Sequence, residues 1–167
     1  MNILALDTSS QAASCALLRD DCLAGEFFLH TGFTHSQTMA PMVEALLRTA
    51  DMAATDIDLF AVATGPGSFT GLRIGIATIK GMALAATKPC VAVPTLQALA
   101  ENLAARDGYI LPVMDARRSQ VYTAMFRCTG GQVTRLREDA ALPIEEVGRI
   151  AEALQEPIML VGDGSLL

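Results

Sequence analysis

Short apolar runs ending in polar turns open this chain, and the first three lie close together. Residues 3–7, ILALD, end on a carboxylate, and the runs ASCALL and CLAGEFFL follow around a turn at Asp20 and Asp21. Runs of this length bounded by turn residues are typical of strands. We therefore predict three strands joined by tight turns.

Helical spacing begins at Ser36, from which apolar residues recur three and four positions apart as far as Ala50. Thr34 or Ser36 can cap this helix, and Pro41 is expected to restrict or kink its first turns. The first half is completed by a strand at 58–64, a helix at 69–86, a strand at 89–93 and a helix at 95–106. The predicted order is three strands and a helix, followed by two strand–helix pairs.

The same pattern starts again after Asp107 and Gly108. The residues YILPVMDARRSQVYTAMF repeat the shape of NILALDTSSQAASCALL, with Asp115 in the place of Asp7. A third strand, QVTRLRE, and a helix, IEEVGRIAEAL, come next, and PIMLVGDGS then mirrors DLFAVATGPGS from the first half. Internal repetition of a whole set of elements is a strong sign of architecture.

Two such halves predict an α/β protein of the actin, hexokinase and Hsp70 type, in which two ribonuclease H-like lobes flank a cleft. We expect an N-terminal lobe at 1–107 and a C-terminal lobe at 108–167. The chain stops where the first half has its longest helix. The second lobe is therefore expected to be incomplete, as in a fragment.

Composition narrows the classes of function. With 51% apolar residues, the chain can bury a substantial core. A net charge of −6 and a pI near 4.8 oppose nucleic-acid binding by this chain alone, because neutralising phosphates needs clustered Lys and Arg. The short basic clusters, Arg117 with Arg118 and Arg135 with Arg137, are interpreted as ordinary surface charge.

The sequence favours a reducing cytoplasm. Its four cysteines lie far apart with no C-x-x-C pair, which argues against a zinc knuckle or a disulfide framework. The N-terminus has no basic region, and the apolar segment 81–100 is interrupted by Lys88, Pro89 and Pro94. We expect neither export nor membrane insertion.

The segment GPGSFTGLRIG at 65–75 opens the long helix. Backbone amides at a helix N-terminus bind anions, but Leu72 and Arg73 follow Gly71 where a Walker A loop has Lys and Ser or Thr. A serine hydrolase elbow is also unsuitable, because the positions two residues either side of Ser68 are not glycine. The sequence thus disfavours both a phosphate loop and a serine nucleophile.

Helix packing is the better interpretation of these glycines. Glycine costs about 1 kcal/mol against alanine inside a helix, so Gly71, Gly75 and Gly81 need a compensating reason. Close approach of another backbone supplies one. That backbone belongs either to the preceding helix of the same lobe or to matching helices on another chain, and both alternatives stay open.

A vestigial nucleotide cleft is the second candidate site. A phosphotransferase of this fold would hold hydrated magnesium between Asp7 and Asp115, with Thr8 and Ser9 small enough to admit phosphates. Arg117 stands where such enzymes have a glycine, and its side chain could fill the phosphate site or pair with either aspartate. The two aspartates fit equally well as caps that bond to amides of their own turns.

Five segments resemble the TsaB (YeaZ) family in the right order: LALDTSS, HSQTMAPMVEALL, GPGSFTGLRIG, VPTLQALA and MDARRSQVY. Members of that family are longer than this chain, and they are non-catalytic partners of the TsaD enzyme in making threonylcarbamoyladenosine on tRNA. The resemblance implies a cytoplasmic scaffold or activator subunit with no cofactor of its own, so that ATP, ADP or magnesium would be held only in the partner or at the interface. It also implies a TsaE-type ATPase in the larger complex and a homodimer when the chain is alone.

The resemblance places the partner contact on helices 36–50 and 69–86. The expected interface residues are Met39, Met42, Val43, Leu46, Gly71, Arg73, Ile74, Gly75, Thr78 and Met82. No catalytic or metal-binding residue is expected, because His30 and His35 do not have the spacing of a ligand pair. The alternatives are an ATP-dependent kinase or phosphotransferase of the same fold and a stand-alone binding module that homodimerises.

Overall fold

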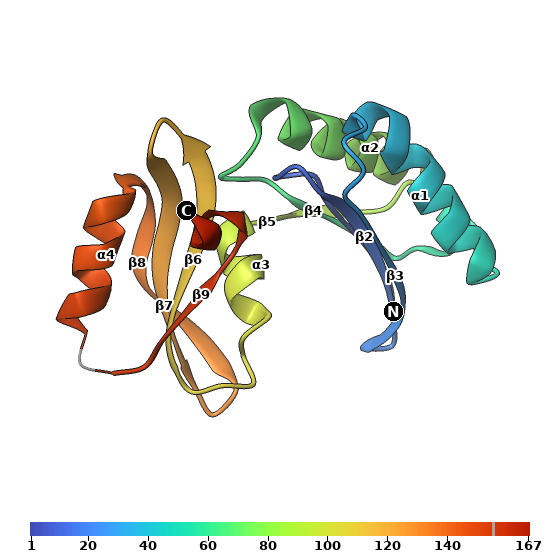
Figure 1. Ribbon diagram of the computed structural model, residues 1–167. Helices are drawn as coiled ribbons and strands as arrows, with labels where there is room; N and C mark the ends of the chain where they lie inside the picture. Colours follow the sequence, from blue (N-terminus) through green and yellow to red (C-terminus); the bar gives the residue numbers. More distant parts are fainter. Residues whose placement is uncertain (155) are drawn as a thin grey trace. The chain divides into compact units, whose positions relative to one another are not determined.

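The computed structural model describes residues 1–154 and 156–167, and the chain divides into two compact units, Met1–Val93 and Pro94–Leu167. Figure 1 shows the elements of both. The division falls earlier than the expected boundary at residue 107. The reason is that Leu96 and Ala100 are fully buried in an apolar cluster with Ile110 of the second unit.

The first unit is built on a five-stranded sheet in the order β3-β2-β1-β4-β5. Its strands are β1 (Asn2–Asp7), β2 (Ala13–Arg19), β3 (Cys22–Leu29), β4 (Leu59–Ala63) and β5 (Cys90–Val93). The first three strands are antiparallel, as their short turns require, and β4 and β5 run parallel to β1. Asp20 and Asp21 both have positive φ, the conformation of a two-residue hairpin turn whose twist matches that of the strands.

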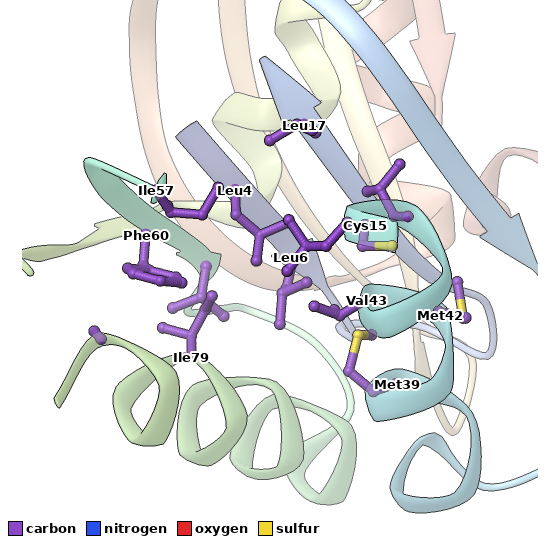
Figure 2. Close-up of a cluster of buried hydrophobic side chains, with 14 of the residues drawn as sticks. Leu4, Leu6, Cys15, Leu17, Met39, Met42, Val43, Ile57, Phe60 and Ile79 are labelled. Atoms are coloured by element: carbon purple, nitrogen blue, oxygen red, sulfur yellow. The ribbon is translucent and has the colours of Figure 1, made fainter. Parts of the chain in front are cut away.

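Two helices, α1 (His35–Thr49) and α2 (Phe69–Ala86), pack on this sheet, with the short 3-10 helix η1 (Ala54–Asp56) between α1 and β4. Side chains of β1, β2 and both helices point into one apolar cluster, as Figure 2 shows. The pairs Leu4 with Leu17 and Leu6 with Cys15 place four of these side chains in register on one face of the sheet. Helix α1 continues through Pro41, which is exposed. One face of each helix therefore packs against this sheet.

The second unit contains α3 (Thr95–Glu101), β6 (Gly108–Arg117), β7 (Gln120–Thr129), β8 (Gln132–Pro143), α4 (Ile144–Ala153), β9 (Ile158–Val161) and the 3-10 helix η2 (Asp163–Leu166). Its sheet has the order β8-β7-β6-β9, with antiparallel hairpins and β9 parallel to β6. This is the order of the first four strands of the other unit, so the repeat seen in the sequence is a repeat of topology. Helix α3 packs with Ile110 and Met114, whereas α4 packs with Leu111 and Val113, so the helices cover opposite faces.

Candidate functional site

The turn after β1 is held by the first turns of both helices of its unit. Thr8 is fully buried, and its hydroxyl donates a hydrogen bond to the carbonyl oxygen of Gly71 at 2.8 Å. The amide of Ser68, the N-cap of α2, donates to the carbonyl oxygen of Ser9 at 2.6 Å. A hydrogen bond of 2.9 Å joins Nε2 of His35 to the carbonyl oxygen of Ser10. Three separate sequence motifs therefore meet at one turn.

The glycines at the start of α2 lie directly against this turn. A Cβ atom at Gly71 would overlap the carbonyl oxygen of Thr8, and one at Gly75 would overlap the hydroxyl oxygen of the same residue. A Cβ at Gly67 would overlap the carbonyl oxygen of Ser9. The close backbone approach predicted for these glycines is therefore found at Gly71, where the backbone is that of Thr8 and belongs neither to α1 nor to another chain. At Gly75 the approaching group is the side chain of Thr8. Of the three glycines inside α2, Gly81 alone has open space around it.

Each strand-end aspartate caps its own turn. Asp7 accepts a hydrogen bond from the amide of Ser9 at 2.7 Å, and Asp115 accepts one from the amide of Arg117 at 2.6 Å. These are the bonds that the capping interpretation requires. Thr8 and Ser9, expected to be small so that phosphates could approach Asp7, are buried beneath the start of α2. Their small size is therefore explained by helix packing.

The expected interface residues divide into two groups. Six of them are buried within the first unit: Met39, Met42, Val43, Leu46, Gly71 and Gly75. The expectation that these six form an accessible surface is corrected by this burial, because the methionines of α1 belong to the core that Figure 2 shows. Arg73 is exposed, while Ile74, Thr78 and Met82 are partly exposed. These four remain available to a partner.

The outward face of α2 contains residues that the interface prediction left out. It consists of Phe69, Arg73, Ala77, Lys80, Gly81 and Leu84, all exposed. The Phe69 side chain is 69% exposed and that of Leu84 is 82% exposed. The guanidinium of Arg73 stacks over the Phe69 ring at 3.8 Å from its centre. A helical projection of the sequence already groups Arg73, Ala77, Lys80 and Leu84, and this signal could have identified the face.

Helix α2 is long and apolar enough, by length and composition, to cross a membrane. Its buried residues are only Gly71, Gly75, Ile79 and Ala83, which pack on the sheet of the first unit. Ile76, Met82 and Ala86 pack partly against the same core, whereas Phe69 and Leu84 are exposed and lie outside it. Within residues 1–154 and 156–167, no three His, Cys, Asp or Glu side chains gather in a way that could hold a metal ion.

The repeated sheet order places the chain in the actin, hexokinase and Hsp70 class, with its ribonuclease H-like topology. The (R)-2-hydroxyglutaryl-CoA dehydratase component A of Acidaminococcus fermentans has the same fold, with a TM-score of 0.51 at 14% identity over 86% of this chain and 48% of that one.

Closer similarity identifies the family. The TsaB protein of Bacillus subtilis (strain 168), a tRNA threonylcarbamoyladenosine biosynthesis protein, is 36% identical over 167 residues, which is 100% of this chain and 73% of the relative. YeaZ from Pseudomonas aeruginosa superposes with a TM-score of 0.85 at 32% identity, over 98% of this chain and 76% of that one. A family model described as TsaD, tRNA N6-adenosine threonylcarbamoyltransferase, matches residues 31–160. The chain belongs to the TsaB (YeaZ) family, within the wider family that the TsaD model describes.

Proposed function

We propose that this chain is a non-catalytic subunit that pairs with a TsaD-type enzyme in making N6-threonylcarbamoyladenosine on tRNA. The observation that carries the proposal is the outward face of α2, where apolar and small side chains stay exposed on a helix whose other side is fixed to a sheet. Exposed apolar surface of this kind is typical of protein contact sites. The name of the Bacillus subtilis relative supports a role in threonylcarbamoyladenosine biosynthesis.

The shape of this face suits a helical partner. Ala77 and Gly81 lie one turn apart and have short side chains or none, so another helix can approach closely between the longer residues. Phe69 and Leu84 stand at the two ends of α2, where they can enter the grooves of a facing helix. Arg73 and Lys80 supply positive charge on the same face, so the partner surface is expected to carry acidic groups.

The turn at Asp7 supports a non-catalytic role. Its aspartate is engaged with the amide of Ser9, and both residues that follow Asp7 are buried by α2. A phosphate could therefore approach this turn only if the start of α2 moved. We accordingly assign nucleotide and magnesium to the partner or to the interface, and we place a TsaE-type ATPase in the larger complex.

Titration of the purified chain with a TsaD-type protein on a sizing column tests the pairing. The chain alone is expected to elute as a homodimer that uses the outward face of α2, and addition of the partner should replace it with a heteromeric complex. Product assays should then show threonylcarbamoyladenosine only when the TsaD-type protein is present. Failure to form any complex would instead favour a stand-alone binding module. Magnesium-dependent ATP turnover by the pure chain would favour a kinase.

A further inference from the structure

Thr8 is a buried polar residue whose carbonyl oxygen and hydroxyl both lie against α2. Its carbonyl oxygen lies against Gly71 and its hydroxyl lies against Gly75, one helical turn further along. The same hydroxyl donates to the carbonyl oxygen of Gly71, from a position 63 residues away in the sequence. One residue at the end of β1 therefore touches the helix backbone at two successive turns.

This contact is stiff because Thr8 lies directly against the helix backbone, through its carbonyl oxygen at Gly71 and its short side chain at Gly75, with no side chain of α2 between them. Elsewhere along α2, residues such as Ile79 pack on the sheet through side chains that can adjust their rotamers. The separation is set at Gly71 by the backbone carbonyl of Thr8 and at Gly75 by its hydroxyl, and such packed contacts have little room to deform. Thr8 thus determines how closely the first half of α2 approaches the sheet.

The side of α2 opposite this contact is the exposed one. With 3.6 residues per turn, positions 73, 77, 80 and 84 lie across the helix from positions 71 and 75. All four of these outward residues are exposed. A displacement of the helix backbone at Thr8 therefore carries the outward face with it.

We propose that Thr8 is a positioning residue for the partner surface. It sets the distance between the first half of α2 and β1, and this distance sets the position of the outward face. This inference rests on the proposed pairing with a TsaD-type enzyme. Thr8 does not touch the partner, and its influence on association passes through Gly75 and the helix backbone.

A double-mutant cycle on the full chain separates this role from direct partner contact. In Gly75→Ala the new methyl overlaps the Thr8 hydroxyl, and the helix is expected to move outward, which should weaken binding to the TsaD-type protein about tenfold. Adding Thr8→Ala removes that hydroxyl and leaves the Cβ of residue 8 at 3.5 Å, an ordinary contact. The double variant should therefore recover affinity to within about threefold of the unsubstituted chain.

Gly71→Ala is the matched comparison. Its added methyl would overlap the backbone carbonyl oxygen of Thr8, which no side-chain substitution removes. Thr8→Ala should therefore rescue Gly75→Ala and fail to rescue Gly71→Ala. Gly148→Ala, at an exposed helical glycine with open space in the second unit, should bind the partner like the unsubstituted chain.

The outcomes distinguish the inference from the proposed function. If the unsubstituted chain does not bind the TsaD-type protein, the proposed function fails and the inference fails with it. If that chain binds but the double variant stays as weak as Gly75→Ala while unfolding normally in urea, the partner itself needs the glycine and the positioning role is overturned. Should Gly75→Ala fail to fold, Thr8→Ser and Thr8→Ala decide: the serine keeps the hydroxyl and should bind normally, the alanine should bind several-fold more weakly, and equal affinities would overturn the proposal.

Discussion

The four cysteines differ sharply in their surroundings. Cys15 and Cys128 are buried, whereas Cys22 and Cys90 are exposed on edge strands. Burial raises the pKa of the Cys15 thiol to about 11, an effect that a backbone hydrogen bond at Phe27 partly offsets. The thiolate is the reactive nucleophile. The Cys15 thiol is therefore unreactive for two reasons: reagents cannot reach it, and it stays protonated near neutral pH.

Thiol labelling at pH 8 should therefore proceed in two phases. We expect Cys22 and Cys90 to react quickly with a disulfide reagent, and Cys15 and Cys128 to react only when the chain unfolds in denaturant. Absorbance of the released thiol measures both phases, and the Cys22→Ser and Cys90→Ser variants should each lose one fast equivalent. Uniform reaction of all four thiols in the folded chain would contradict the packing of Cys15 in the core.

Single residues also mark the limit of what the sequence can reveal. The glycine cost predicts that Gly71, Gly75 and Gly81 lie against another backbone, and this is correct for Gly71, whereas Gly75 lies against the Thr8 side chain and Gly81 has open space. Nothing in the sequence points to Thr8 as the neighbour, because its hydrogen bond to Gly71 joins motifs 63 residues apart. Sequence periodicity describes one helix at a time, while contact partners depend on how strand order brings distant segments together.

At the scale of elements, the strands and the longer helices lie where the apolar pattern predicts. Boundaries differ where a local hydrogen bond competes with the regular pattern. Helix α3 was expected to extend to residue 106 and ends at Glu101, where the amide group of the Asn102 side chain donates to the carbonyl oxygens of Ala98 and Leu99. Such side-chain bonds compete with the backbone of a helix.

The outward face of α2 makes a prediction at the same scale. Leu84→Lys places a charge on an exposed apolar position of this face, so it should weaken association with a TsaD-type protein about tenfold by leaving a desolvated charge in an apolar contact. Stability should change by less than about 0.5 kcal/mol, because the side chain is 82% exposed. Analytical sizing and urea unfolding measure the two effects.

Leu136→Lys is the matched control for this substitution. Leu136 is 52% exposed on the edge strand β8 of the second unit and lies on neither α1 nor α2. It should leave both association and stability unchanged. Equal weakening by the two substitutions would show that added charge, rather than the α2 face, governs association.

The whole molecule is organised by a repeat that the sequence reveals only in outline. The four strands of the second sheet repeat the order and direction of β3, β2, β1 and β4. In each unit a glycine after the last of these strands packs closely, Gly67 against Ser9 in the turn after β1 and Gly164 against Met114 within β6. The boundary between the two units does not follow from the repeat, because α3 follows β5 along the chain yet packs with the second sheet. The order of elements along the chain therefore does not show that α3 belongs to the second unit.

The net charge of the whole molecule predicts how the chain alone interacts with nucleic acid. The chain carries 12 Lys and Arg against 18 Asp and Glu, for a net charge of −6. Proteins that bind nucleic acid without specificity neutralise several phosphates and reach dissociation constants of about 10⁻⁴ to 10⁻⁶ M at physiological salt. A chain with excess negative charge should bind more weakly than this, so filter binding should show no saturable retention of tRNA by the chain alone. Micromolar binding that falls steeply between about 50 and 200 mM salt would instead indicate a phosphate-binding surface and a direct role in holding the substrate.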